Sequence, residues 1–310
     1  MIKDFKENTR IKEQLLVASS TTGVTTAGSR YLNILLQDVS KQIDARKWDA
    51  TDEDVEIFKA GNVVEVEADV IKFRNDLQLK VLRGKVCNDD IDPTNFVTSA
   101  PVSKNELQAK FLAYVDNIKH PEIAAIIKEV INDVFISFFN YPAAVKNHHD
   151  YISGLAHHTV TMLDLASSIC DIYPDLDREI LYAGVILHDI GKIEELSGSV
   201  LPKYTVKGKL LGHISIMQAK VYEIANRLQI NSEIPILLQH MILSHHGKYE
   251  YGSPVLPLTK EAEVLSMIDN LDAKLNTINK ALSTIEEGET THRLFSLDDR
   301  MFYKPTKNKK

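Results

Sequence analysis

The residues best suited to chemistry in this 310-residue chain are histidines and aspartates spread over its second half. A central pair, His188-Asp189, is flanked at long range by further residues of both types. Imidazole nitrogens combined with carboxylate oxygens suit Mn, Fe, Co, Ni or Zn better than Mg or Ca. The pattern predicts a divalent-metal site whose ligands are His158, His188, Asp189, His213, His245, His246 and Asp269.

This set of ligands is large enough for two ions. An aspartate can bridge two metals through its two carboxylate oxygens, and Asp189 is the natural shared ligand. One ion would take His158, His188, Asp189 and Asp269. The other would lie near the second oxygen of Asp189, beside His213, His245 and His246. Two metals held roughly 3.5–4 Å apart suit the hydrolysis of phosphate esters, with hydroxide as the attacking group.

Apolar neighbours distinguish these residues from ordinary polar side chains. The segments VILHDIG, LLGHISI, MILSHHG and LSMIDNL place most of them in apolar surroundings. Uncompensated ionisable groups there would be costly, and metal coordination would compensate them together. Two adjacent histidines cannot share one helical face. Gly247, directly after His246, can end the helix and let both rings turn toward one metal.

The other histidines are weaker candidates. His157 lies next to His158 and could replace it as a ligand, whereas His240 is expected to have a structural role. The rest lie in polar segments, and we expect them to be solvated: His120, His148, His149 and His292.

Three lysines near the candidate ligands could contact a phosphate. Lys192 lies four residues after His188, which would place both on one helical face. Its ammonium could hold a phosphate oxygen and offset charge that grows in the transition state. Lys207 and Lys209 precede His213 and could contact phosphates as well. Asp189, as the metal bridge, and Lys192 are therefore the predicted catalytic residues.

Two hydrophobic periods divide the chain into two domains. Residues 11–86 contain short apolar runs, and VVEVEADVIKF alternates with period two, which predicts strands. A turn at Asn75-Asp76 would pair this run with LQLKVLRGKV. Several strands and one acidic helical stretch, 49–60, favour a small closed β-barrel over a parallel sheet.

From Ser103 onward, apolar residues recur every three or four positions, which predicts helices. Ser103 and Glu106 predict a capping box at the first of them. The chain is therefore expected to be an α+β protein. We expect a barrel over 1–90, a linker over 91–102, a helical bundle over 103–295 and a basic, frayed tail over 296–310.

The composition limits the class of protein. Apolar residues make up 44% and charged residues 25%, which is ordinary for a globular domain. We expect no membrane span, because no run of 18 apolar residues occurs, and no signal peptide, because the N-terminus is polar. Cys87 and Cys170 show no paired spacing, so two free thiols in a reducing cytoplasm are expected.

The net charge of -7 does not indicate a general nucleic-acid binder, so a binding surface would have to be local. Small barrels can bind single strands by stacking bases on aromatic rings and by placing cations along the phosphates. The candidate stacking residues are Tyr31, Trp48, Phe58 and Phe73. The candidate phosphate contacts are Arg30, Lys72, Arg74 and Lys80. Acidic side chains slightly outnumber basic ones over residues 1–100, so the barrel as a whole is not a basic clamp.

From about residue 150 to 280 the chain resembles the HD-domain metal-dependent phosphohydrolases. It resembles their extended two-metal form, because His213 and His245-His246 accompany the minimal H…HD…D pattern. In that family Thr or Ser typically follows the first histidine, which favours His158, followed by Thr159, over His157. Cyclic-dinucleotide phosphodiesterases share the extended form, but their GYP segment does not occur near the last ligands here.

Over nearly its full length the chain is most similar to the YhaM-type 3′–5′ exoribonucleases. The similarity includes GLAHHT, LHDIGK, LLGHI, LSHHG and IDNLDAK. The resemblance implies a five-stranded OB-fold barrel followed by an HD helical domain. It also implies two divalent ions, Mn²⁺ first and Co²⁺, Fe²⁺ or Ni²⁺ as alternatives. The implied reaction releases nucleoside monophosphates from the 3′ ends of single-stranded RNA, with single-stranded DNA as a second substrate class. Whether the chain forms a homo-oligomer stays open.

Two other functions stay open at this point. The metal ligands alone are compatible with hydrolysis of a small nucleotide, although such a substrate needs no strand-binding barrel. A DNA-binding replication factor with a structural metal is the other alternative. Structural metal sites tend to be closed and mononuclear, so the large ligand set favours the hydrolase.

Overall fold

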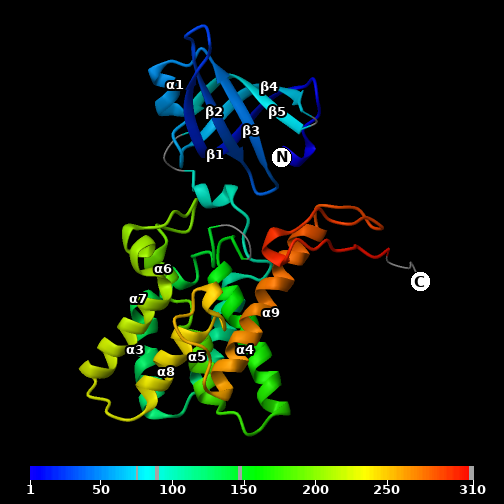
Figure 1. The fold of residues 1–310 in the computed structure, drawn as a ribbon. Coiled ribbons are helices and arrows are strands. Elements are labelled where there is room, and N and C mark those ends of the chain that lie inside the picture. Colours follow the sequence, from blue (N-terminus) through cyan, green and yellow to red (C-terminus); the bar gives the residue numbers. More distant parts are fainter. Residues whose placement is uncertain (75, 88–90, 146–148, 307–310) are drawn as a thin grey trace. The chain divides into compact units, whose positions relative to one another are not determined.

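The computed structural model describes residues 1–74, 76–87, 91–145 and 149–306. The chain forms two compact units, Met1–Ser99 and Ala100–Lys310 (Figure 1). The first unit is built from strands and the second from helices, so the predicted α+β class is confirmed.

The N-terminal unit is a closed five-stranded barrel. Its strands are β1 (Arg10–Val24), β2 (Arg30–Gln37), β3 (Gln42–Trp48), β4 (Val63–Phe73) and β5 (Asp76–Val86). They follow the order β1-β2-β3-β5-β4, in which β3 and β5 are parallel and the other pairs antiparallel. A short helix, α1 (Asp52–Ile57), joins β3 to β4 and begins with a capping box between Thr51 and Asp54. This Greek-key barrel is the predicted OB-fold.

Strand β4 shows why the barrel closes around an apolar interior. Its alternate residues Val64, Val66, Ala68 and Val70 are fully buried, as the period of a strand requires. Phe73 pairs with Asp76, so the predicted β4–β5 hairpin is confirmed, although Asn75 lies outside the described residues.

The second unit is a helical bundle. Its helices are α2 (Lys104–Asp116), α3 (Pro121–Phe138), α4 (Gly154–Ile172), α5 (Arg178–Leu187), α6 (Lys192–Glu195), α7 (Val206–Arg227), α8 (Ile234–Ser244) and α9 (Lys260–Leu282). Ser103 accepts a hydrogen bond from the amide of Glu106, which confirms it as the N-cap of α2. Of the predicted capping box, this is the half that occurs among the described residues. Short 3-10 turns occur at Ile2–Asp4, Pro93–Phe96, Tyr249–Tyr251 and Phe295–Leu297.

Helix α5 is the centre of the bundle. Every residue from Ile180 to Leu187 is buried, and α3, α4, α8 and α9 all contact this helix. Gly184 lets α8 approach, because a Cβ atom there would overlap the end of the Met241 side chain. The C-terminal end of α5 therefore delivers whatever follows it into the core of the unit.

The end of the described chain is partly paired. Bridges join Thr290 to Tyr303 and Leu294 to Arg300, within and beside the segment predicted as a tail. Cys87 and Cys170 are free thiols, as expected. Among the described residues, no helix has the combination of length and apolar character needed to cross a bilayer.

Candidate metal centre and nucleic-acid interface

Helix ends place the central His-Asp pair. His188 is the C-cap of α5, and a turn carries the chain through Asp189 to the start of α6 at Lys192. The helix therefore does not continue from His188 to Lys192, and the prediction that both lie on one helical face is wrong. Both members of the pair are buried because α5 is enclosed on all sides.

One group of candidate ligands combines α4, α5 and α9. His158 lies in the first turns of α4 and is fully buried. Its Nε2 atom lies 3.2 Å from Oδ1 of Asp269 in α9 and 3.4 Å from Nε2 of His188. His158, His188 and Asp189 each place one donor atom within 4.8 Å of the others, which is close enough to hold one ion.

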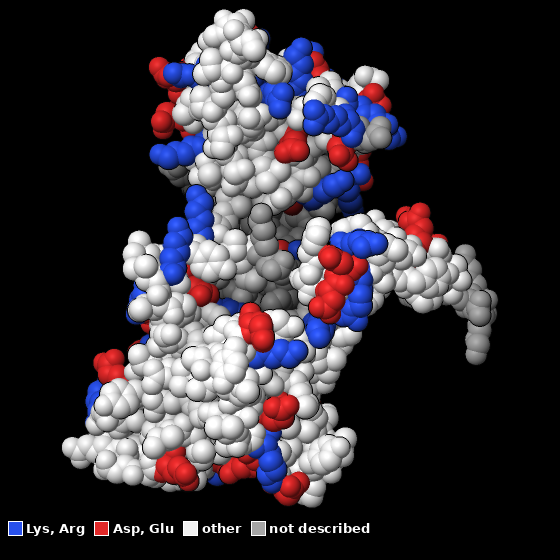
Figure 2. All heavy atoms as spheres, in the orientation of Figure 1, with Lys and Arg blue, Asp and Glu red and all other residues white. Residues whose placement is uncertain are grey.

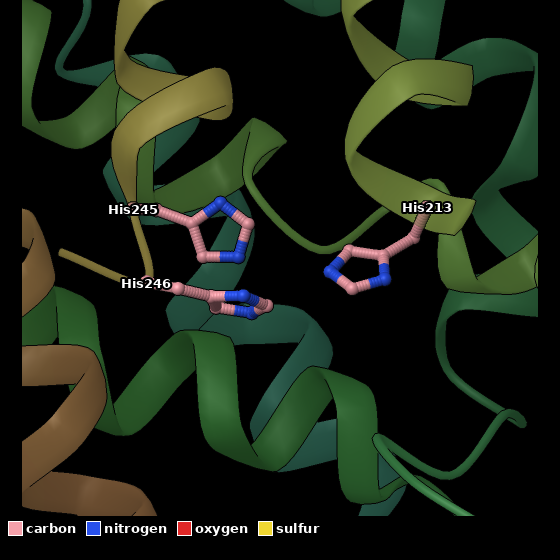
Figure 3. Close-up of side chains that lie close together, drawn as sticks. All are labelled: His213, His245 and His246. Carbon is pink, nitrogen blue, oxygen red and sulfur yellow. The ribbon is translucent and has the colours of Figure 1, made fainter. Parts of the chain in front are cut away.

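A second group combines α7 and α8. His213 follows a kink at Gly212 in α7, where φ is 71°. His245 is the C-cap of α8 and His246 follows it, and Gly247 then turns the backbone with φ of 73°. The predicted helix end is thus confirmed. The rings of His245 and His246 lie side by side and face His213 across a gap (Figure 3). One donor atom from each lies within 4.8 Å of the others.

Asp189 lies between the two groups and presents a different oxygen to each. Its Oδ2 atom is 3.4 Å from Nε2 of His188 and 3.8 Å from Nε2 of His158. Its Oδ1 atom is 3.5 Å from Nε2 of His213 and 3.8 Å from Nε2 of His245. This is the arrangement expected of a carboxylate that is shared by two cations.

Three buried polar atoms at this point have no hydrogen-bond partner within the described part of the chain. They are Oδ1 of Asp189, Nε2 of His213 and Nε2 of His245. Buried polar atoms are rarely left unsatisfied, because each one costs free energy. A carboxylate oxygen with two imidazole nitrogens 3.5 Å and 3.8 Å away is a donor set that a divalent cation satisfies. These residues therefore fit a metal ion.

Backbone carbonyls fix three of the rings. Nδ1 of His188 lies 2.8 Å from the carbonyl oxygen of Val185, and Nδ1 of His245 lies 2.7 Å from that of Ile242. His246 makes the same contact at 2.7 Å with the carbonyl oxygen of Tyr251. A carbonyl oxygen only accepts, so each Nδ1 carries a proton and each Nε2 keeps its lone pair for a metal.

The electrostatics of the two groups differ. Burial holds the pKa of His245 well below its usual value, so this ring is neutral and ready to ligate. Burial also opposes a charge on His158, but hydrogen bonds to Asp269 and Asp272 outweigh it and raise its pKa to about 10. His158 must therefore lose a proton before it can ligate a metal.

Lys192 lies against the bridging carboxylate. Its Nζ atom is 2.6 Å from Oδ2 of Asp189, and the side chain is largely buried. Burial works against its charge, but the attraction of Asp189 outweighs this and raises the pKa of Lys192. Lys207 pairs with Glu194 and, like Lys209, is exposed at the start of α7.

Sequence reasoning misplaced one histidine and missed two acids. His149 was expected to be solvated, but it is 1% exposed, and its Nε2 atom lies 2.6 Å from Oδ2 of Asp272. Asp272 and Glu195 are both buried beside candidate ligands. The three-residue step from Asp269 to Asp272 would have placed both on one face of α9, whereas nothing in the sequence around Glu195 marked it.

The other histidines mostly follow expectation. His120 and His292 are exposed, and His148 lies outside the described residues. His240 accepts a hydrogen bond from the amide of Leu258 and so has the predicted structural role. Nδ1 of His157 is bonded to the Tyr151 hydroxyl, whereas His158 faces Asp269, which favours His158 as the ligand of this pair.

The barrel carries a second candidate site. Tyr31 and Trp48 lie 5.2 Å apart between ring centroids, and the guanidinium of Arg46 lies over both rings. Trp48 is 40% exposed and Phe73 is 48% exposed. A groove of about 560 Å³ runs over β2, β3 and the β4–β5 hairpin and is lined in part by Arg46, Phe73 and Arg74.

Several predicted contacts on the barrel have other environments. Phe58 is fully buried and packs against Gly84, where a Cβ atom would overlap its ring, so its prediction as a stacking platform is wrong. Arg30 pairs with Asp52. Lys72 and Lys80 are exposed on β4 and β5. Figure 2 shows basic and acidic side chains intermixed on the visible face of this unit, in keeping with its composition.

Comparison with known proteins identifies the second unit and the family of the whole chain. A family model for the HD domain matches residues 155–274. The chain is 48% identical over 297 residues to the 3′–5′ exoribonuclease YhaM of Bacillus licheniformis, covering 95% of both chains. It is 47% identical over 302 residues to the protein of the same name from Bacillus subtilis, covering 97% of this chain and 96% of the relative. The chain belongs to the YhaM family.

Within the YhaM family, a further relative from Bacillus pumilus is 44% identical over 307 residues, with 98% of each chain covered. Two solved structures resemble parts of the chain more remotely. One is the second OB-fold domain of replication protein A from Methanococcus maripaludis, with a TM-score of 0.24 and 15% identity over 30% of this chain and 97% of that one. The other is the HD domain of the L. monocytogenes phosphodiesterase PgpH, with a TM-score of 0.30 and 19% identity over 53% of this chain and 80% of that one. The HD domain and its clustered His and Asp residues indicate divalent-metal binding.

Proposed function

We propose that this chain is a metal-dependent 3′–5′ exoribonuclease that degrades single-stranded RNA to nucleoside monophosphates. The observation that carries the proposal is Asp189, whose two oxygens face two separate groups of histidines. The YhaM relatives, which are similar over nearly the whole chain and are named for this activity, supply the reaction and its direction.

The donor set supports two ions. The first would be held by His158, His188, Asp189 and Asp269, and the second by His213, His245, His246 and the other oxygen of Asp189. Mixed nitrogen and oxygen ligands suit Mn²⁺, Co²⁺, Fe²⁺ and Ni²⁺, and we place Mn²⁺ first because the family resemblance implies it. Two such ions supply Lewis acidity and an activated water for attack on phosphorus.

The chain's own residues prepare the site for that chemistry. Backbone carbonyls hold three of the ligand rings in one tautomer, so little reorganisation is needed when an ion binds. Lys192 places a buried positive charge beside Asp189. A cation in this position can offset the negative charge that grows on a phosphate during hydrolysis.

The barrel supports a single-stranded substrate. Bases can stack on exposed aromatic rings, and arginine can contact both rings and phosphates. Phe73 with Arg74, and Tyr31 and Trp48 with Arg46, supply this combination beside or along one groove. Stacking and charge do not distinguish sugars, so we include single-stranded DNA as a second substrate class. Both cysteines are free thiols, which suits the proposed location in a reducing cytoplasm.

The test uses 5′-labelled single-stranded RNA, Mn²⁺ and three proteins: wild type, Asp189→Asn and Asp116→Asn. Asp116 is an exposed aspartate of α2, so its variant is a matched control. We expect wild type and Asp116→Asn to shorten the RNA stepwise from its 3′ end, and Asp189→Asn to be inactive. Wild-type protein that fails to shorten RNA with any of Mn²⁺, Co²⁺, Fe²⁺ or Ni²⁺ would contradict the proposal. Cleavage of dinucleotides but not of longer strands would instead favour a small-nucleotide hydrolase.

A further inference from the structure

Two of the five histidines at the candidate metal centre are backed by a buried carboxylate rather than by a backbone carbonyl. Nδ1 of His158 lies 2.6 Å from Oδ2 of Asp272. Nδ1 of His213 lies 3.2 Å from Oε1 of Glu195, which also accepts a hydrogen bond from the His213 amide. The two histidines belong to different groups of ligands, so each half of the centre contains one such pair.

The Asp272 oxygen takes two imidazole donors. Nε2 of His149 also lies 2.6 Å from Oδ2 of Asp272. A carboxylate oxygen only accepts, so both Nδ1 of His158 and Nε2 of His149 carry protons. Burial opposes the charge of Asp272, but the hydrogen bonds from His149 and His158 outweigh it and hold its pKa far below its usual value. Protonated nitrogens do not ligate metals, so this close trio is a hydrogen-bonded cluster and not a third ion site.

The cluster continues toward the surface in a fixed direction. Nδ1 of His149 lies 2.6 Å from the Tyr151 hydroxyl, which lies 2.7 Å from Nδ1 of His157. In a singly protonated His149 ring, Nδ1 accepts the hydroxyl proton, because Nε2 already donates to Asp272. Tyr151 in turn accepts from Nδ1 of His157, so the chain of donors runs His157, Tyr151, His149, Asp272.

Helix α9 thereby holds the His158 ring from both sides. Asp269 faces Nε2 at 3.2 Å, and Asp272 faces Nδ1 at 2.6 Å. The two aspartates are three residues apart and so lie on the same helical face. Rotation of the ring about its bond to Cβ would break both contacts. The orientation of Nε2 is therefore fixed by Asp272 on the side away from the metal centre.

We propose that Asp272 and Glu195 are positioning residues, one for each ion. Asp272, supported by His149, Tyr151 and His157, fixes the tautomer and raises the basicity of His158, and Glu195 does the same for His213. This inference rests on the proposed two-ion centre. Carboxylates that accept a hydrogen bond from the second ring nitrogen of a metal-bound histidine typically contribute about 10–100-fold to metal affinity. Removing the charge of Asp272 or of Glu195 should therefore lower the affinity for one of the two ions by about that factor.

The first test measures Mn²⁺ binding by calorimetry and by metal analysis after dialysis against limiting Mn²⁺. Asp272→Asn and Glu195→Gln remove one charge each without changing the side-chain volume, and Asp116→Asn is the control. We expect wild type and control to keep two ions per chain and each of the two variants to lose one first, with affinity reduced about 10–100-fold. Two variants that bind both ions as tightly as the control would overturn the inference. Wild-type protein that takes up no Mn²⁺ would overturn the proposed function itself.

The second test reads the tautomers directly and needs no metal. Nitrogen-detected NMR of metal-free wild type should show the proton of His149 on Nε2 and the proton of His157 on Nδ1. Tyr151→Phe removes one hydroxyl, and we expect His149 to keep its proton on Nε2, where Asp272 still accepts it, and Mn²⁺ binding to weaken less than in Asp272→Asn. A wild-type His149 that is protonated on Nδ1 would refute the proposed chain even if Asp272→Asn proved too unstable to study.

Discussion

The ion pair between Asp189 and Lys192 should govern the stability of the metal-free protein. Both charges are buried, and their atoms lie 2.6 Å apart. Replacing Asp189 with Asn keeps the volume but leaves the Lys192 ammonium inside the bundle without its counter-charge. Removing one partner of a buried pair costs about 3–5 kcal/mol, because the remaining charge stays desolvated.

The expected loss is large enough to measure by heating. For a unit of about 200 residues, 1 kcal/mol shifts the midpoint of unfolding by about 2–4 °C, so Asp189→Asn should lower Tm by roughly 6–20 °C. The assay follows the helical circular-dichroism signal with EDTA present. The double variant Asp189→Asn/Lys192→Met removes both charges and should recover more than half of the loss.

A surface pair provides the control. Asp133→Asn breaks the pair with Lys220, in which the aspartate is 60% exposed, and should cost no more than about 1 kcal/mol. Additive effects of Asp189→Asn and Lys192→Met, within about 0.5 kcal/mol, would refute the coupling between the two charges, because independent sites add and a buried ion pair does not.

Three further predictions concern metal, fold and substrate. The pKa of His158 is raised to about 10, so the metal-free ring is protonated at neutral pH and must release a proton when it ligates a metal. The affinity for Mn²⁺ should therefore rise about tenfold per pH unit. Calorimetry in buffers of different ionisation enthalpy should count one proton released by this residue. An affinity that does not change between pH 6.5 and 8 would contradict this. Gly191→Ala would place a Cβ atom against the backbone carbonyl of His213. We therefore expect the free energy of unfolding, measured by chemical denaturation, to fall by about 1–3 kcal/mol, and the second ion to bind more weakly. An unchanged free energy of unfolding would contradict the close packing of Gly191 against His213. Phe73→Ala should weaken single-stranded RNA binding by about 1–3 kcal/mol in fluorescence anisotropy, whereas Val39→Ala, at another exposed apolar residue of the same unit, should not.

The sequence was sufficient for the type of secondary structure in each half and for selecting the candidate ligands that the structure brings together. Period-two alternation in β4 and the buried helix α5 were both readable, because a strand and an enclosed helix impose distinct patterns on apolar residues. The glycine after His246 also predicted the local helix end correctly.

Contacts between distant residues were not readable in the same way. His149 looked solvated because its neighbours in sequence are polar, but its partner Asp272 lies 123 residues away. The turn between His188 and Lys192 was missed because the apolar period of α5 was extended through LHDIGK, although Gly191 is a poor helix former and is the N-cap of α6. Arg46 was not singled out, because its position over Tyr31 and Trp48 depends on the register between β2 and β3.

The most direct measurement is an anomalous-scattering map from crystals of the Mn²⁺-loaded protein. We expect two peaks about 3.5–4 Å apart, the separation of two-metal sites. One peak should lie beside Oδ2 of Asp189 with His158, His188 and Asp269, and the other beside Oδ1 with His213, His245 and His246. A single peak, or peaks that do not share Asp189, would contradict the proposed centre.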